Sequence, residues 1–303
     1  MIRYVDAYRA QFGVEAICRT LRATECGFIT ARGFRAAVAR SRSERSVRDE
    51  QLVAEIARIH GANFSVYGVR KMHVAMRRAG WDVGRDQVAR LMRAAGVQGA
   101  SRGRKAFTTV SDPRSPRPAD LVERRFAADG PGRLWVADIT YVATWAGFAY
   151  TAFVTDVFSR RIVGWAVSPS LTTQALPMQA LNMAAFMNTV DDTLIHHSDR
   201  GVQYVSLAYS TRLADLGIAA SVGSTGDSYD NALAESVNAA YKTELIRARK
   251  PWRTVEEVEL ATLEWVHWFN TARLHENLGH RTPAEVEHDY YADHTRAPAL
   301  TTT

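Results

Sequence analysis

Apolar positions in the first hundred residues recur with the period of about 3.6 residues that an amphipathic helix needs. The pattern predicts helices in five segments, at 14–21, 34–38, 49–60, 67–79 and 85–95. Gly80 ends the fourth segment as a helix-terminating glycine does, and a short turn leads into the fifth. Two short helices joined by a tight turn predict a helix-turn-helix at about residues 67–95, although a plain helical hairpin gives the same pattern.

From residue 134 the helical period ends, and runs rich in residues typical of strands follow. Three β-rich runs predict an antiparallel meander, at 134–142, 148–158 and 160–168. Helices and strands then alternate: we expect helices at 172–188, 205–216, 228–246 and 254–271, and strands at 193–197 and 218–222. This order is that of an α/β fold of the RNase-H-like type, a mixed five-stranded sheet with helices. The predicted domains are a helical region at 1–96, a linker at 97–128, an RNase-H-like core at 129–290 and a tail at 291–303.

Charge is divided unevenly along the chain. Residues 1–118 hold 23 Lys and Arg against 10 Asp and Glu, a net charge of +13, whereas residues 119–303 hold 15 against 22, a net charge of −7. An excess of this size indicates that the first part binds a polyanion such as DNA, the alternative being a basic face turned to solvent. The candidate DNA-contacting residues of this part lie on the second helix of the predicted pair and in the basic linker: Arg85, Gln87, Arg90, Arg93, Arg102, Arg104 and Lys105.

The composition excludes several classes of protein. An apolar content of 47% is too high for a disordered chain. No apolar run approaches the roughly 18 residues of a membrane helix, and the N-terminal stretch is charged where a signal peptide would be apolar. Cys18 and Cys26 cannot build a disulfide framework, and the chain has no CxxC pair to bind structural zinc. We therefore expect a cytoplasmic protein.

Three carboxylates lie where the predicted fold can bring them together. Asp138 is in the middle of the first strand, where an acid among apolar residues is costly unless it is paired or binds a metal. Asp199 directly follows the fourth strand, and Glu235 lies on the long helix at 228–246. On that helix Asn231, Glu235, Asn238 and Lys242 fall on one face.

Three converging carboxylates without cysteine or clustered histidine ligands are typical of a site for Mg²⁺ or Mn²⁺, which prefer oxygen donors. Two such ions about 3.5–4 Å apart can activate a water or a DNA 3′-hydroxyl for in-line displacement at a phosphodiester. We expect Asp138 to bridge both ions, with Asp199 and Glu235 each holding one. Lys242, together with Asn231 and Asn238, is the candidate for contacts with DNA near this site.

The local sequences resemble those of a known family. The spacing of Asp138, Asp199 and Glu235, with a lysine seven residues after the glutamate, is similar to the DDE core of retroviral integrases and transposases. The strings RLWVADITY, HHSDRGVQY, GDSYDNALAESVNAAYKTEL and WFNTARLHENLGHRTPAE resemble the second-frame transposase of the insertion-sequence-three family. The resemblance covers nearly the whole chain, and it implies a metal-dependent enzyme that cleaves and joins insertion-sequence ends in the bacterial nucleoid.

The resemblance also sets expectations about partners and cofactors. It implies DNA substrates, a homo-oligomer on that DNA, and an upstream-frame helix-turn-helix protein as a fusion or partner. Retroviral integrases carry an N-terminal zinc module, but this chain lacks its cysteines, so we expect no zinc. Two alternatives stay open, a DNA-binding regulator of transposition without catalysis and an RNase-H-like nuclease that does not join strands.

Two other polar groups near the strands are interpreted as structural. Asp156 ends an apolar strand just before Ser159, and we expect it to cap a turn rather than bind a metal. His196 and His197 are adjacent on a strand, so their side chains point to opposite faces and cannot converge on one site. His197 is expected to line the site or to make a hydrogen bond in the core.

Overall fold

The structure is a computed structural model that describes residues 1–24, 27–101, 127–198, 203–222 and 232–295. Contacts divide the chain into two compact units, Met1–Glu55 and Ile56–Thr303. The helix-turn-helix segment thus shares a unit with the sheet. The predicted domain boundaries at 96 and 128 stay a prediction. No helix in the described part of the chain combines the length and apolarity that a membrane span needs.

The first unit is helical, as its apolar period predicts. It contains α1 (Ile2–Phe12), α2 (Val14–Arg22) and α3 (Ala31–Ala39), and α4 (Glu44–Ala62) begins in it. Its small core consists of Val5, Ile17, Cys18 and Phe34. The sequence pattern missed α1, in which Val5 is the only buried residue and the apolar stripe of Tyr4, Tyr8 and Phe12 is exposed.

The predicted pair of helices is present in the second unit as α5 (Val69–Arg78) and α6 (Arg85–Ala94). Gly80 has a φ of 86°, which favours glycine, and the Trp81 N–H bonds to the Met76 carbonyl 3.0 Å away, so α5 ends at this turn. Met76 and Val88 are among the buried residues of the two helices. The elements of the predicted helix-turn-helix are therefore confirmed.

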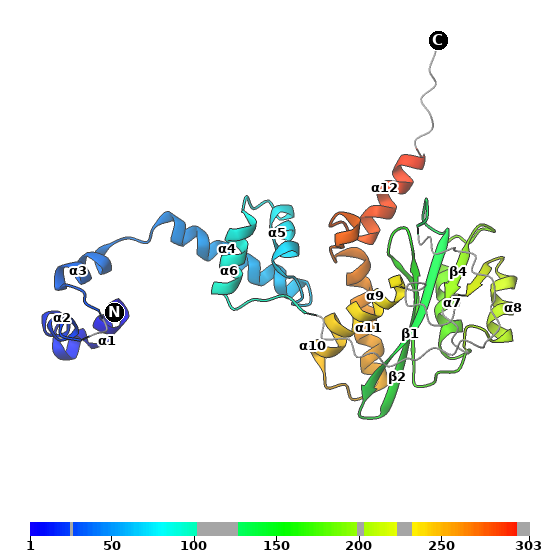
Figure 1. Cartoon of the computed structure of the whole chain (residues 1–303), viewed down its shortest axis with the longest axis horizontal. Coiled ribbons are helices and arrows are strands. Elements are labelled where there is room, and N and C mark those ends of the chain that lie inside the picture. Colours follow the sequence, from blue (N-terminus) through cyan, green and yellow to red (C-terminus); the bar gives the residue numbers. More distant parts are fainter. Residues whose placement is uncertain (25–26, 102–126, 199–202, 223–231, 296–303) are drawn as a thin grey trace, which may run out of the picture. The chain divides into compact units, whose positions relative to one another are not determined.

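A five-stranded sheet forms the centre of the second unit (Figure 1). Its strands are β1 (Leu134–Thr144), β2 (Gly147–Asp156), β3 (Ile162–Ser168), β4 (Ile195–Ser198) and β5 (Ala219–Val222). They lie in the order β3-β2-β1-β4-β5. The first three strands pair antiparallel, and β4 and β5 run parallel to β1, so β1 is the central strand. This is the predicted mixed sheet of the RNase-H-like fold.

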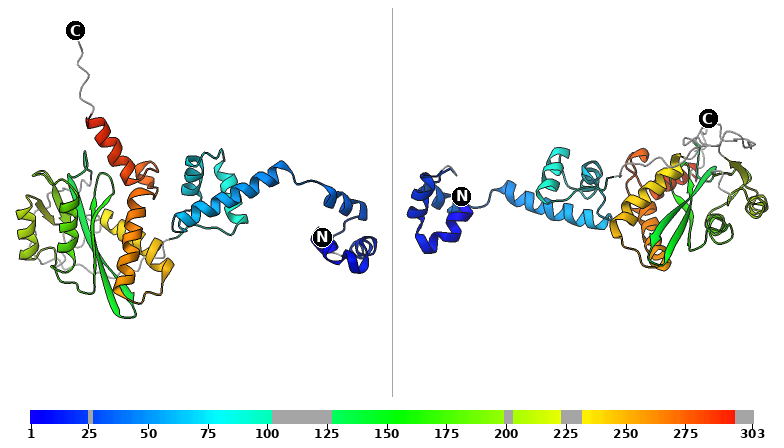
Figure 2. Two further views of the ribbon diagram at one scale, coloured as in Figure 1. Left: turned by 180° about the vertical axis from the view of Figure 1, so that it is seen from behind. Right: turned by 60° about the horizontal axis from the view of Figure 1, so that its bottom comes forward.

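Helices cover both faces of the sheet, which Figure 2 shows from two further directions. On one face α7 (Pro177–Met187) and α8 (Leu207–Asp215) pack on residues such as Ala137 and Val154. On the other face lie α9 (Ala232–Tyr241) and α11 (Val255–Thr271). Trp265 of α11 is fully buried against Phe153 of β2, which confirms that its apolar stripe belongs to the core.

The chain beyond Tyr241 departs from the predicted regular helix. The residues Lys242–Ile246 form a π-helical turn, η1, before α10 (Arg247–Arg249). The Glu244 carboxylate of this turn is buried and accepts two hydrogen bonds from Arg273, at 2.6 and 2.9 Å. The short helix η2 (Glu276–Leu278) and α12 (Pro283–Thr295) follow.

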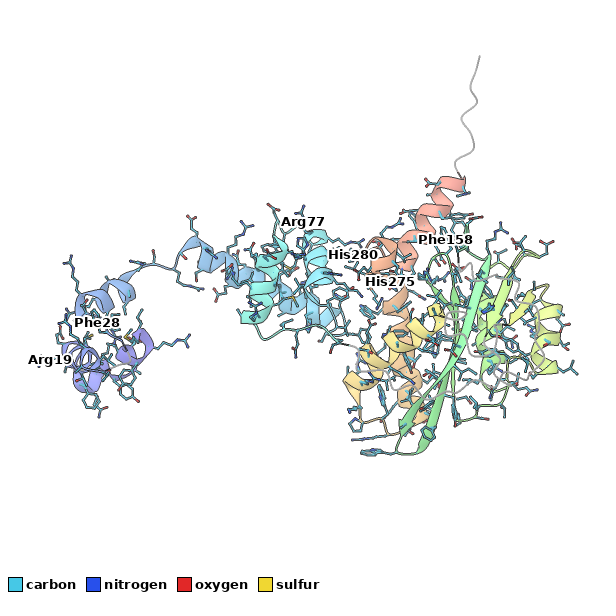
Figure 3. The ribbon with its side chains drawn as sticks, viewed as in Figure 1. Arg19, Phe28, Arg77, Phe158, His275 and His280 are labelled. Atoms are coloured by element: carbon cyan, nitrogen blue, oxygen red, sulfur yellow. The ribbon has the colours of Figure 1, made fainter. Side chains whose placement is uncertain are left out.

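The helix-turn-helix segment contacts the C-terminal helices of the same unit. The Tyr67 hydroxyl accepts a hydrogen bond from the Leu274 N–H at 2.9 Å. Arg78 binds the Glu285 carboxylate through both of its terminal nitrogens, and it donates to the carbonyl of His280, a residue that Figure 3 labels. These bonds join residues about 200 positions apart, which no periodicity reveals.

Candidate active site

Asp138 lies on the central strand, at the place where the sequence predicts a buried acid. Its Oδ2 atom accepts a hydrogen bond of 2.8 Å from the Asn238 side-chain amide, and its Oδ1 atom accepts one of 2.8 Å from the Ile139 N–H. Side chains alternate along a strand, so Asp138 shares a face of β1 with Val136. Asp138 is thus half-buried beside an apolar cluster, and the two N–H donors offset the cost of removing its carboxylate from water.

The helix that covers this face carries the second predicted acid. Ala234 of α9 is buried in a cluster with Leu134 and Val136, and this packing fixes α9 over β1. Glu235 and Asn238 are three positions apart, so they lie one turn apart on the same side of α9. Because the Asn238 amide reaches Asp138, the side of α9 that carries Glu235 faces the same end of β1.

The third predicted acid, Asp199, lies outside the described residues, as does Asn231. The described part of β4 ends at Ser198, which pairs with Ala137, the residue before Asp138. Within the described residues, no three His, Cys, Asp or Glu side chains are grouped as metal ligands. The joint site of the three acids is therefore still a prediction.

Lys242 is half-buried at the first position of the π-helical turn. Its ammonium lies 4.7 Å from the centre of the Tyr141 ring. Burial lowers the pKa of Lys242 and Arg247 lowers it further, whereas the charge of Asp138 raises it. Lys242 is thus an electrostatic neighbour of the candidate acid, as its spacing along the helix predicts.

Asn238 is the residue whose role the sequence did not reveal. The spacing placed it on a face toward DNA, and in the structure it is buried with its amide on Asp138. Its part in the site is therefore to orient a carboxylate, and a contact with DNA stays a prediction. Its position one helical turn after Glu235 is the feature of the sequence that could have indicated a contact with the acids.

Asp156 and the two adjacent histidines, which we interpreted as structural, each make hydrogen bonds within the fold. Asp156 is buried and accepts hydrogen bonds from the Ser159 N–H at 2.8 Å, the Ser159 hydroxyl at 2.9 Å and the Gly132 N–H at 2.8 Å. Burial raises the pKa of Asp156, although these donors oppose the shift. His196 bonds to the Tyr209 hydroxyl at 3.1 Å and His197 to Ser221 at 3.0 Å. The two histidines do not converge.

The candidate DNA-contacting residues of α6 lie on its outer side. Arg85, Arg90 and Arg93 are exposed and Gln87 is half-buried, whereas Val88 and Leu91 face the core. The linker candidates lie outside the described residues: Arg102, Arg104 and Lys105. The exposure of the α6 arginines leaves them accessible to a ligand.

Comparisons with known proteins agree with this architecture. Residues 128–228 and 216–283 each match an integrase core domain, and residues 47–105 match an HTH-like domain. The chain is 48% identical over 292 residues to the transposase for insertion sequence element IS629 of Shigella sonnei, covering 96% of this chain and 97% of that protein. It is 29% identical over 287 residues to transposase InsF for insertion sequence IS3A of Escherichia coli strain K12, covering 94% and 97%.

Among solved structures, the chain resembles the HTLV-2 integrase catalytic core domain in complex with magnesium, with a TM-score of 0.43 and 15% identity. That match covers 54% of this chain and 100% of the other. The identity to the insertion-sequence transposases, over nearly their whole length, is much higher. The chain therefore belongs to the DDE transposases of bacterial insertion sequences, in the insertion-sequence-three family, and the resemblance predicted from its motifs is confirmed.

Proposed function

We propose that this transposase cleaves DNA at insertion-sequence ends and joins the ends to a target, using Asp138, Asp199 and Glu235 as its catalytic acids. The observation that carries the proposal is the hydrogen bond from Asn238 to Asp138. It connects the acid of the central strand to the helix that carries Glu235. Asp199 is included because it directly follows β4, the strand that pairs with β1 up to Ala137.

The acids are suited to Mg²⁺ or Mn²⁺. Carboxylate oxygens are the donors that these ions prefer, and the amide on one oxygen of Asp138 fixes the direction of that carboxylate, as groups behind metal ligands commonly do. Asp138, Asp199 and Glu235 would together hold two such ions. When bound, such ions make a water or a 3′-hydroxyl a stronger nucleophile and stabilise the leaving oxygen.

In this proposal, basic residues of the chain hold and orient the DNA. Lys242, whose charge interacts with that of Asp138, binds a phosphate near the site in this proposal. The exposed arginines of α6 and the linker cations supply the further phosphate contacts, and the excess charge of residues 1–118 supports that division. In the cell the protein acts as a homo-oligomer on DNA, with an upstream-frame protein as a further partner.

The proposal is tested by neutral, isosteric substitutions. We expect Asp138→Asn, Asp199→Asn and Glu235→Gln each to abolish cleavage of an end-containing duplex while DNA binding stays nearly intact. Asp215→Asn, an exposed aspartate of α8, is the matched control and should cleave normally. Retained cleavage in one of the three variants removes that residue from the catalytic set.

The metal and the joining step need separate measurements. Mg²⁺ or Mn²⁺ should support strand transfer, whereas Ca²⁺ should permit binding with little chemistry because its coordination is looser. Cleavage in EDTA would contradict the metal site. Cleavage without strand-transfer products would favour a nuclease, and end-specific binding without cleavage would favour a regulator.

A further inference from the structure

The far end of the hairpin formed by β1 and β2 exposes three large aromatic side chains. Tyr141 is 59% exposed, Trp145 71% and Phe148 51%. We call these three residues the hairpin aromatics. Single exposed apolar residues are ordinary, but several on one hairpin mark a surface that binds something.

The hairpin aromatics are held in place from two sides. The rings of Tyr141 and Phe148 meet edge to face, with centroids 5.7 Å apart. At the turn, the N–H of Trp145 bonds to the Trp252 carbonyl at 3.1 Å and the N–H of Ala146 to the Arg253 carbonyl at 3.2 Å. The hairpin end is therefore fastened to the segment that follows α10, and its rings are pre-organised for a ligand.

Cations lie over these rings. Lys242 is 4.7 Å from the centre of the Tyr141 ring, and the Arg253 guanidinium is 5.5 Å from that of Trp145. Both belong to residues 242–253, which hold five Lys or Arg and one acid, Glu244. That acid is buried on Arg273, so it does not offset the outward charge. We call residues 242–253 the basic segment.

The charge of the basic segment decides between two classes of ligand. Residues 119–303 have a net charge of −7, and the basic segment is a positively charged stretch within this negative region. Aromatic faces beside Lys and Arg suit a polyanion that also has flat, stackable groups, which describes a nucleic acid. A second copy of this acidic region offers charge but no stackable bases.

The surface is also close to the candidate active site. Tyr141 is three residues beyond Asp138 on the same strand, about 10 Å along it at 3.3 Å per residue, and this odd spacing turns its side chain to the opposite face of β1. Lys242 joins the two places, because its ammonium covers Tyr141 while its charge interacts with Asp138.

We infer that the hairpin aromatics stack on unpaired nucleobases of the DNA beside the cleavage point, while cations of the basic segment bind the adjoining phosphates. Bases inside a duplex are already stacked on their neighbours, so an aromatic side chain gains a base face only where the strands have separated. The inference rests on the proposed function, since it names the form of DNA that the site receives.

The test measures binding by the full-length protein in EDTA, so that no cleavage occurs. Each variant is titrated with a short single strand, with a duplex of the same sequence, and with that duplex carrying an unpaired 3′ tail. We expect the double variant Tyr141→Ala/Phe148→Ala to weaken binding of the single strand and the tailed duplex about 5- to 150-fold, the range for loss of one stacked base. Binding of the blunt duplex should change by less than about twofold, because the α6 arginines are intact.

Two variants serve as controls. Tyr141→Phe keeps the ring, so it should bind as the original protein does. Phe186→Ala removes an aromatic of α7 that is 88% exposed, and it should leave all three affinities unchanged. Circular dichroism of each variant verifies the fold. A 2-aminopurine base in the 3′ tail gives a readout on the unaltered protein, since stacking on an aromatic ring quenches its fluorescence.

The outcomes separate this inference from the proposed function. Equal loss of duplex and single-strand binding would overturn the inference, and so would an absence of 2-aminopurine quenching. Variants that lose self-association but keep their affinity for the single strand would also overturn it, because they would assign the surface to a second copy. Cleavage that depends on Asp138 and Glu235 while the aromatic variants bind normally would leave the proposed function standing alone. Selective loss of single-strand binding in a protein that never cleaves DNA would support this inference and contradict the proposed function.

Discussion

Replacement of Glu244 by alanine should destabilise the second unit strongly, because it breaks a buried ion pair. The side chains of Glu244 and Arg273 are only 10% and 13% exposed, and two hydrogen bonds join them. Removing one partner of a buried pair leaves the other charge without compensation, at a cost of about 3–5 kcal/mol. The Arg273 guanidinium also lies over the Phe269 ring, 5.1 Å from its centre.

The matched control is Asp289→Ala. Asp289 pairs with Arg281 at 2.9 Å, but the two side chains are 55% and 46% exposed. An exposed pair contributes about 0–1 kcal/mol, so this change should be nearly silent. A third protein, Glu244→Leu/Arg273→Met, removes both charges and should lose much less stability than Glu244→Ala does, because no charge is left buried and unpaired.

Urea unfolding of the full-length protein, followed by tryptophan fluorescence, measures these differences. Trp265 and Trp268 are buried in α11, the helix that ends two residues before Arg273, so their emission reports on this region. Equal midpoints for Glu244→Ala and Asp289→Ala would refute the reasoning. A double variant as unstable as the single one would show that packing, rather than the unpaired charge, sets the cost.

Three further results are expected. Asn238→Leu should slow cleavage about 10- to 100-fold and raise the Mg²⁺ concentration required, because Asp138 loses its orienting amide; unchanged metal dependence would contradict that role. Burial lowers the pKa of His196 from 6.5 to about 4 and that of His275 from 6.5 to about 3. The free energy of unfolding is therefore full above about pH 6.5 and falls toward pH 4 by about 1.4 kcal/mol per pH unit for each histidine. A urea midpoint that does not change across this range would contradict these lowered pKa values. Alanine at the three exposed arginines of α6 should flatten the plot of log K against log salt for duplex DNA by about 2–3 units, provided that each binds a phosphate.

The sequence predicted the sheet well, because its strands are rich in β-branched and aromatic residues and are separated by turn-like residues. An acid inside the otherwise apolar run around Asp138 is visible without any structure. The strand order then follows from the order of elements, and all five strands were found at the predicted places within a few residues.

The parts that could not be predicted depend on contacts between distant residues. A helical period shows which side of α9 is buried, but it does not show that Asn238 meets an oxygen of a residue 100 positions earlier. The same holds for Tyr67, whose hydroxyl accepts the N–H of Leu274. α12 was missed for another reason: its sequence is charged on most sides, and its hydrophobic face is reduced to residues such as Val286.

The π-helical turn at Lys242–Ile246 has a consequence for the rotational phase of the helix. Such a turn fits one residue more into a full rotation than an α-helical turn does, so each of its residues advances the helix by less than the roughly 100° of an α-helix. Deleting a single residue there would restore an α-helical turn, and Arg247 and the residues after it would keep their direction relative to Glu235. A one-residue gap at this point in a relative would therefore leave the basic segment aimed the same way, whereas a one-residue gap in the regular part of α9 would turn that segment by about 100°.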